Sequence, residues 1–205
     1  MSSKTFPGRG LYVITDGPRP DLLVVIRQAL EGGASLVQYR DKTHDARRRQ
    51  DEASAIKALC AGFGVPMIVN DDVTLAQSVG ADGVHLGEHD GELASARKLL
   101  GGRAVIGVSC YDDIERARSL AAAGADYVAF GAFFPSPTKP QARQASAELL
   151  RQSAALRVPR VAIGGITPDN GASLIDAGAD YLAVISSVFR AADVRAAARR
   201  FADLF

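Results

Sequence analysis

The sequence predicts a single-domain α/β fold, a (β/α)8 TIM barrel, over residues 1–205. The first observation is a phrase that recurs as GGASLVQY from Gly32, VGADGVHL from Val79, AGADYVAF from Ala123 and AGADYLAV from Ala177. Each copy reads as the end of a helix, a small turn and an apolar strand, and the spacing leaves room for two strand–helix units per copy. The second observation is that the strands are continuously apolar, which is typical of a parallel sheet buried on both faces.

The eight expected strands fall in order along the chain. Four lie in the repeated phrase, and the others are LYVIT from Leu11, VPMIVN from Val65, AVIGVS from Ala104 and PRVAIGG from Pro159. Helical patterns occupy, among others, the segments 21–31, 45–60, 112–123 and 146–156. Glycines stand where each helix would end with a positive φ, at Gly33, Gly80, Gly124 and Gly178. The main alternative is an open doubly wound sheet, which the repeat and the lack of a GxGxxG turn after the first strand disfavour.

Composition narrows the class of protein. The net charge of +1 argues against a nucleic-acid or membrane-surface partner attracted by bulk charge. Two cysteines, Cys60 and Cys110, form no disulfide framework and favour a reducing compartment. No segment has the apolar length of a membrane span, and the first residues lack a signal-peptide pattern. We therefore expect a cytoplasmic protein that acts on small molecules, in an oligomeric state that the sequence leaves open.

In such a barrel the catalytic groups follow the carboxyl ends of the strands. After the second strand, Gln38, Arg40 and Lys42 alternate, so they share one face while Tyr39 and Asp41 point the other way. Three donors, two of them cationic, would therefore converge at the barrel mouth and favour an anionic ligand.

A second candidate anion site follows the sixth strand, in the segment 126–140. Prolines hold it extended, so that Ser136, Thr138 and Lys139 could point at a phosphate. The same pattern is typical of an ordinary proline-stiffened surface loop, and the segment alone does not decide between the two. Near the seventh strand end, Gly164 and Gly165 would let a ligand approach the backbone.

The loops after the last two strands form the recurrent phosphate site of this fold. Thr167 and Pro168 are expected as N-cap and first residue of the next helix, and Ser186 as the start of the last one.

Two carboxylates from neighbouring strands predict a magnesium site. Asp71 ends the third strand after Asn70, and Asp90 follows the fourth. Mg²⁺ takes one or two protein carboxylates and keeps several waters. Asp72 is better explained as a helix cap. His85 and His89 are not expected to bind metal, because Gly87 interrupts any helix that would align them.

Together these segments resemble the thiamine phosphate synthase family. The motifs are LYVITD, VQYRDK, VNDD, GVHLGEHD, GVS, FFPSPTK, AIGGI and AVIS, in this order over nearly the whole chain. The resemblance implies a transferase that condenses a hydroxymethylpyrimidine diphosphate with a hydroxyethylthiazole phosphate to thiamine phosphate and pyrophosphate. It implies a dissociative substitution assisted by Mg²⁺, in which cationic side chains stabilise the leaving diphosphate.

The resemblance also assigns residues. Pyrimidine diphosphate would be bound by Gln38, Tyr39, Arg40, Asp41, Lys42, Asn70, Ser109 and Lys139. Thiazole phosphate would be bound by Ser136, Pro137, Thr138, Gly165, Ile185 and Ser186. Mg²⁺ would be bound by Asp71 and Asp90, and the cationic groups acting in catalysis would be Arg40, Lys42 and Lys139.

Three positions depart from the commonest family pattern. Glu88 replaces a frequent Gln, Ser136 a frequent Thr, and Tyr111 a frequent His. The alternatives are a thiazole tautomerase of the same superfamily, which uses a His near position 111, and a sensor that binds thiamine precursors without turnover. A phosphosugar isomerase or lyase would need a strand-end Glu base or a Schiff-base Lys, and neither is evident. The absent His and the two retained aspartates favour the synthase.

Overall fold

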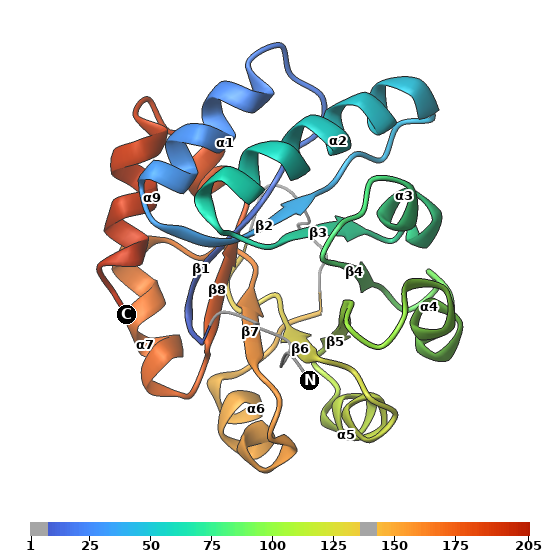
Figure 1. Cartoon of the computed structure of the whole chain (residues 1–205). Helices are drawn as coiled ribbons and strands as arrows, with labels where there is room; N and C mark the ends of the chain where they lie inside the picture. Colours follow the sequence, from blue (N-terminus) through green and yellow to red (C-terminus); the bar gives the residue numbers. More distant parts are fainter. Residues whose placement is uncertain (1–7, 136–142) are drawn as a thin grey trace.

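Eight parallel strands close into a barrel in the computed structural model, which describes residues 8–135 and 143–205 (Figure 1). Strand β1 pairs with both β2 and β8, and this second pairing closes the sheet. The strands are β1 Gly10–Ile14, β2 Ala34–Tyr39, β3 Met67–Asn70, β4 Gly83–Leu86, β5 Val105–Tyr111, β6 Tyr127–Phe130, β7 Arg160–Ile163 and β8 Tyr181–Val184. The predicted barrel is confirmed, and the open doubly wound sheet is wrong because no strand edge of the sheet is left unpaired.

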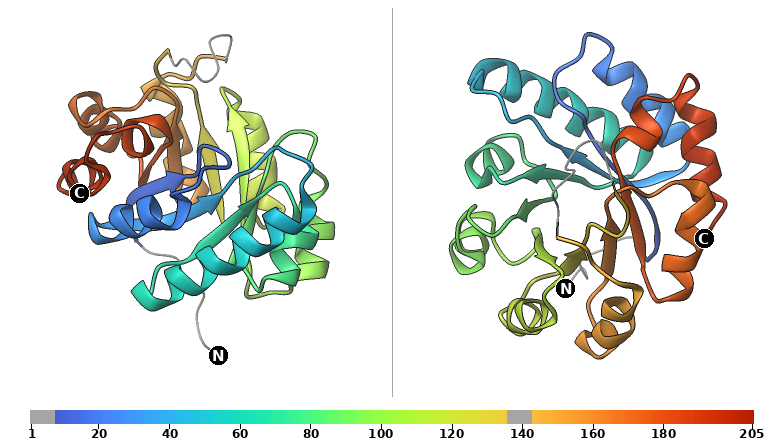
Figure 2. Two further views of the ribbon diagram at one scale, coloured as in Figure 1. Left: turned by 90° about the horizontal axis from the view of Figure 1, so that it is seen from above. Right: turned by 180° about the vertical axis from the view of Figure 1, so that it is seen from behind.

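Helices form a ring outside the strands, as the views in Figures 1 and 2 show. They are α1 Leu22–Glu31, α2 Ala46–Phe63, α3 Val73–Ser78, α4 Leu93–Leu100, α5 Ile114–Ala122, α6 Ala147–Gln152, α7 Pro168–Asp176, α8 Ser186–Phe189 and α9 Val194–Ala202. A 3-10 turn, Ser153–Leu156, continues α6 and completes the helical segment expected there. Among the helices of the described residues, none has both the length and the apolar character needed to cross a bilayer.

The repeated glycines end helices as predicted. They have positive φ values of 102°, 63°, 97° and 108° at Gly33, Gly80, Gly124 and Gly178. Each follows the C-cap residue of its helix by one position, where a left-handed conformation turns the chain toward the next strand. The repeat in the sequence is therefore a repeat of one helix-to-strand turn.

The end of the chain differs from the prediction in one respect. Ser186 begins the short helix α8 and not the last helix. The last helix, α9, begins after Asp193, whose carboxylate accepts a hydrogen bond of 2.8 Å from the backbone N–H of Ala196. This N-cap supplies the stronger helix start, because it satisfies a backbone donor that the first turn leaves unpaired.

Side chains fill the inside of the barrel. The interior cluster consists of Tyr12, Ile14, Leu36, Ile68, Val105, Tyr127, Ala129, Val161, Tyr181 and Ala183. Gly107 makes room for the Tyr127 ring, since a Cβ atom at Gly107 would lie 1.8 Å from Cζ of that ring. Alternate strand residues face outward and pack against the helices. The packed interior confines any ligand to the carboxyl ends of the strands, where the polar residues gather.

Candidate active site

A cavity of about 610 Å³ opens at the carboxyl ends of the strands. All eight strands contribute to its wall. The side chains with polar groups that line it are Tyr12, Gln38, Arg40, Lys42, Asn70, Asp71, His85, Asp90, Ser109, Tyr111, Arg143, Thr167, Ser186 and Ser187. This volume suits one or two small polar ligands, and the mixture of cations, carboxylates and hydroxyls suits phosphorylated ones.

The cavity brings together most of the residues that the sequence singled out. Those lining it are Gln38, Arg40, Lys42, Asn70, Asp71, Asp90, Ser109, Gly165, Ile185 and Ser186. The predicted residues Ser136, Pro137, Thr138 and Lys139 lie outside the described residues, so their part in the site remains a prediction.

Tyr39 and Asp41 have side chains that face away from the cavity. The Tyr39 hydroxyl donates a hydrogen bond of 2.7 Å to Glu52 of α2. The Asp41 carboxylate lies 2.8 Å from Arg48 of the same helix. Since alternate residues of an extended chain point in opposite directions, these two can offer a ligand only backbone groups. The prediction that their side chains point away from Gln38, Arg40 and Lys42 is therefore confirmed, and their part in binding the pyrimidine diphosphate stays a prediction.

Arg40 is held in place by its backbone. The Thr15 hydroxyl accepts a hydrogen bond of 2.7 Å from Arg40 N–H and donates one of 2.9 Å to Arg40 C=O. Among the described residues, the Arg40 guanidinium has neither a hydrogen-bond nor an ion-pair partner. A cation with a fixed backbone and an unpaired head group in a cavity is suited to bind an anion.

The two predicted metal ligands face one another at the mouth. Asn70 Nδ2 donates a hydrogen bond of 2.6 Å to Asp71 Oδ2, and Lys42 Nζ contacts the same oxygen. Gly87 N–H donates to Asp90 Oδ2 at 2.9 Å. Burial raises the pKa of Asp71; Lys42 opposes this rise and the neighbouring Asp90 carboxylate adds to it. Asp71 also has a φ of 63°, an uncommon backbone conformation that often marks functional sites.

The donors at this position fit a hard divalent cation. A buried carboxylate such as Asp71, whose pKa is raised by burial and by a neighbouring carboxylate, is stabilised when a cation takes the place of the proton. Within residues 8–135 and 143–205 no cluster of three His, Cys, Asp or Glu side chains is present. Mg²⁺ does not need one, because it keeps several waters and binds substrate phosphates. Asp72 is confirmed as a helix cap: its carboxylate accepts a hydrogen bond of 2.9 Å from Leu75 N–H at the start of α3.

The two glycines after β7 serve a purpose that the sequence did not reveal. A Cβ atom at Gly165 would lie 2.5 Å from the carbonyl oxygen of Pro135, so the chain after β6 approaches the backbone closely here. The glycines therefore also meet a packing requirement, and because both line the cavity, the approach of a ligand to their backbone stays a prediction. Thr167 is the N-cap of α7 and Pro168 its first residue, as expected.

Four functional candidates were not found from the sequence. Tyr12 and His85 line the floor of the cavity, and both form hydrogen bonds to the buried Tyr127. Burial lowers the pKa of His85 to about 4, and Asp90 partly opposes this effect. At the rim, the Arg143 guanidinium lies 4.8 Å from the centroid of the Tyr111 ring. The inward strand positions could have indicated the first three, whereas no periodic pattern marks Arg143.

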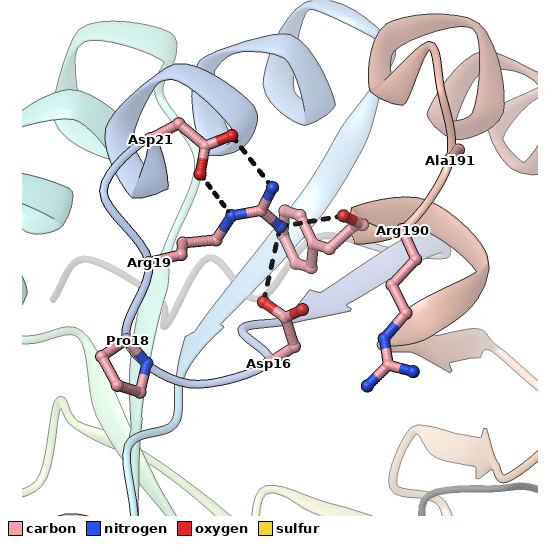
Figure 3. Close-up of a pocket in the computed structure, with 7 residues that line it drawn as sticks. Asp16, Pro18, Arg19, Asp21, Arg190 and Ala191 are labelled. Carbon is pink, nitrogen blue, oxygen red and sulfur yellow. Dashed lines mark hydrogen bonds and ion pairs between the residues drawn. The ribbon is translucent and has the colours of Figure 1, made fainter.

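A second hollow, of about 420 Å³, lies between the start of α1 and the end of α8 (Figure 3). Arg19 crosses it. The guanidinium donates to Asp21 at 2.6 Å and to the Phe189 carbonyl at 2.8 Å, and it lies 3.6 Å from Asp16. Since its charge is already neutralised by these partners, Arg19 joins the start of α1 to the end of α8. Arg190 also lines this hollow, which has no lysine and no carboxylate pair like that of Asp71 and Asp90 among the described residues.

The comparisons with known proteins agree with this geometry. Residues 11–188 match the family described as thiamine monophosphate synthase. The chain is 56% identical over 194 residues to the thiamine-phosphate synthase of Xanthomonas campestris pv. campestris, with 94% of each chain covered. It is 51% identical over 201 residues to that of Nitrosococcus oceani, covering 96% of this chain and 93% of the relative.

A solved structure of similar fold also has a name that belongs to this family. Thiamine phosphate pyrophosphorylase from Pyrococcus furiosus superposes with a TM-score of 0.86 at 36% identity, over 95% of this chain and 94% of the other. The family match spans most of the chain, and the relatives share more than half of the aligned residues. The chain therefore belongs to the thiamine monophosphate synthase family and is an enzyme of the transferase class.

Proposed function

We propose that the enzyme joins hydroxymethylpyrimidine diphosphate to hydroxyethylthiazole phosphate in a dissociative, Mg²⁺-assisted substitution. The products are thiamine phosphate and pyrophosphate. The observation that carries this proposal is the contact of Asp71 with Lys42 and Asp90 at the cavity mouth, beside the Arg40 guanidinium, which has no partner in the described part of the chain. A diphosphate leaving group and a divalent cation need this combination of charges.

The pyrimidine diphosphate would lie between β2, β3 and β5. Gln38 is buried, and with Ser109 it suits the pyrimidine ring, while the cations Arg40 and Lys42, of which Lys42 is exposed, suit the diphosphate. Asn70 can both hold Asp71 and reach a phosphate oxygen. Lys139, outside the described residues, completes this predicted set of cations.

Asp71 and Asp90 would hold the Mg²⁺. When bound, the ion supplies charge neutralisation to the departing diphosphate. Lys42 would then be released from its contact with Asp71 and become available to the substrate. The carboxylate pair therefore also controls the position of a cationic side chain.

The reaction requires no protein nucleophile. The bond between the pyrimidine methylene carbon and the diphosphate oxygen breaks, and its electron pair goes to that oxygen. A pyrimidine-methyl cation results. The lone pair of the thiazole nitrogen then forms the new carbon–nitrogen bond and gives a thiazolium ion. Because negative charge grows on the leaving group, Arg40 and Lys42 stabilise the transition state more than the ground state.

Thiazole phosphate would occupy the side of the cavity formed by β7 and β8. Gly165, Ile185 and Ser186 line this side, as does Thr167, the N-cap residue of α7. The N-terminus of a helix favours a phosphate, because unpaired backbone N–H groups point toward it. Ser136, Pro137 and Thr138 stay predicted contacts from the chain after β6.

The test is a turnover assay. The purified protein is mixed with both substrates, with and without Mg²⁺, and thiamine phosphate is measured as its fluorescent oxidation product. We expect product only when both substrates and the ion are present. A folded protein that binds the substrates and forms no product would contradict the proposal and favour a sensor or an isomerase.

Adjacent aspartates provide a matched pair of variants. Asp71→Asn should remove most of the Mg²⁺-dependent activity. Asp72→Asn should keep it, since Asp72 caps α3 and Asn is an equally good cap. Equal activity in the two variants would exclude Asp71 as a metal ligand.

A further inference from the structure

Five polar side chains from five strands form one chain of hydrogen bonds across the barrel interior. Gln38 Nε2 donates to Tyr12 Oη at 2.6 Å, and Tyr12 Oη lies 3.0 Å from Tyr127 Oη. Tyr127 Oη lies 2.9 Å from His85 Nδ1, and His85 Nε2 lies 2.9 Å from Ser109 Oγ. We call these five residues the interior chain. Both of its ends, Gln38 and Ser109, line the cavity.

The middle of the interior chain is closed to solvent. Tyr12 and Tyr127 are 1% and 0% exposed, and the two rings meet edge to face with centroids 6.1 Å apart. The His85 ring stacks on Tyr127 at 5.6 Å. Because the Tyr12 and Tyr127 hydroxyls are almost fully buried, they need hydrogen-bond partners in the protein, and the interior chain supplies partners for both. The packing therefore fixes which groups meet.

One direction of donation satisfies every group of the interior chain. The Tyr12 hydroxyl accepts from the Gln38 amide and can donate its own proton to Tyr127. Tyr127 can then donate to His85 Nδ1 when the neutral imidazole carries its proton on Nε2. In that tautomer His85 Nε2–H donates to Ser109 Oγ, which leaves the Ser109 proton for a ligand. At the other end, the Gln38 carbonyl oxygen is left as an acceptor.

We propose that the interior chain sets Gln38 as a hydrogen-bond acceptor and Ser109 as a donor, and thereby selects an aminopyrimidine over an oxopyrimidine. This inference rests on the proposed function. An aminopyrimidine offers an amino N–H to an acceptor and a ring nitrogen to a donor. An oxo group in place of the amino group would put two acceptors face to face, which a buried polar site rejects strongly.

Tyr12, Tyr127 and His85 are positioning residues in this scheme, because they act through Gln38 and Ser109. If one link is lost, the two ends can turn independently. Gln38 could then rotate its amide and present N–H groups to the ring. Discrimination between the amino and oxo substrates should fall, while the diphosphate and thiazole sites stay intact.

The experiment measures pyrophosphate release from the aminopyrimidine diphosphate and from its oxo analogue, both at saturating thiazole phosphate. Tyr127→Phe removes the central hydroxyl and keeps the ring. We expect KM for the aminopyrimidine diphosphate to rise on the order of tenfold, and the amino-to-oxo ratio of kcat/KM to fall by a similar factor. KM for thiazole phosphate should not change.

Two further variants separate positioning from packing. Tyr12→Phe breaks a neighbouring link, so combining it with Tyr127→Phe should give little further loss of discrimination. Tyr181→Phe removes a hydroxyl from the same interior cluster, at a residue that does not line the cavity, and should keep the amino-to-oxo ratio. If Tyr127→Phe does not fold, Tyr12→Phe gives the same test.

The outcomes distinguish this inference from the proposed function. A wild-type enzyme that releases no pyrophosphate would overturn both. Normal wild-type turnover with an unchanged ratio in folded Tyr127→Phe or Tyr12→Phe would overturn the interior chain alone. Additive losses in the double variant would also count against a single linked chain.

Discussion

Arg143 Nη2 donates a hydrogen bond of 2.9 Å to Glu88 Oε2, which joins the segment before α6 to the loop after β4. The same guanidinium lies over the Tyr111 ring, and Glu88 N–H donates to the Tyr111 hydroxyl at 3.3 Å. Two of the three departures from the family pattern, Glu88 and Tyr111, therefore contact one arginine. Glu88 and Tyr111 therefore belong to one local structure at the rim of the cavity, whereas the third departure, Ser136, lies outside the described residues.

Arg143→Ala should raise KM for thiazole phosphate by about tenfold, because it removes a cavity cation that follows the predicted thiazole phosphate segment in the chain. Steady-state kinetics with each substrate varied in turn would show this. Arg151→Ala is the control, since Arg151 is an exposed arginine of α6 that does not line the cavity. Unchanged KM values in Arg143→Ala would show that Arg143 only supports the rim.

Glu88→Gln should change the free energy of unfolding by less than about 1 kcal/mol, because Glu88 and its partner Arg143 are both partly exposed.

Lys42→Ala should weaken pyrimidine diphosphate binding by about tenfold or more and leave thiazole phosphate binding nearly unchanged. The reason is that Lys42 contacts Asp71 on the side of the cavity assigned to the diphosphate. Isothermal titration of each substrate would measure both affinities. Equal losses for the two substrates would contradict the division of the cavity into two anion sites.

Magnesium activation should weaken as the pH falls. Burial and Asp90 raise the pKa of Asp71, so its carboxyl group keeps a proton at a higher pH than usual and competes with the metal. The Mg²⁺ concentration for half-maximal activity, measured between about pH 8 and 5, should therefore rise toward acid pH.

In Lys42→Ala, the Mg²⁺ concentration needed for half-maximal activity should begin to rise at a higher pH than in the wild type, because Lys42 lowers the pKa of Asp71. Asp72→Asn should follow the wild-type curve. Identical curves for wild type and Lys42→Ala would show that another group, such as the substrate diphosphate, causes the pH dependence.

The barrel itself could be predicted from local patterns. Four helix ends share a glycine with positive φ, and a continuously apolar strand follows each one. That the side chains of Gln38, Arg40 and Lys42 all point into the cavity could be predicted from the two-residue period of a strand. These features depend only on residues near one another in the chain.

Contacts across the barrel could not be predicted in this way. That Tyr12 and Tyr127 point inward follows from periodicity, but their contact depends on the stagger between strands that lie 115 residues apart in the sequence. The outward direction of Tyr39 and Asp41 was predictable, whereas their helix partners were not. Close backbone approach at Gly165 likewise required knowledge of where the chain after β6 passes.

Gly107→Ala should destabilise the fold by at least about 3 kcal/mol, because the added methyl group would overlap the Tyr127 ring inside a packed barrel. Urea denaturation would measure the free energy of unfolding. Gly102→Ala is the matched control: a Cβ atom there meets no other atom within 4 Å, so the change should be within about 1 kcal/mol. Adding Tyr127→Leu to Gly107→Ala should restore part of the lost stability. If it restored none, the overlap with the Tyr127 ring would not be the cause of the destabilisation.

His85 should make the folded state less stable in mild acid. Its pKa falls from the ordinary 6.5 to about 4 through burial, with Asp90 acting in the opposite direction, and its ring faces Tyr127 and Ser109. Between these two pH values the unfolded chain takes up a proton that the folded protein refuses, so stability is complete above pH 6.5 and is lost as the pH falls toward 4. The loss between about pH 7 and 5 should be about 2 kcal/mol. Urea denaturation without metal at both pH values would measure this loss. His85→Gln should remove this part of the pH dependence, whereas His44→Gln, a change at an exposed histidine, should retain it. If the free energy of unfolding changed equally with pH in the wild type and both variants, a buried neutral His85 would be contradicted.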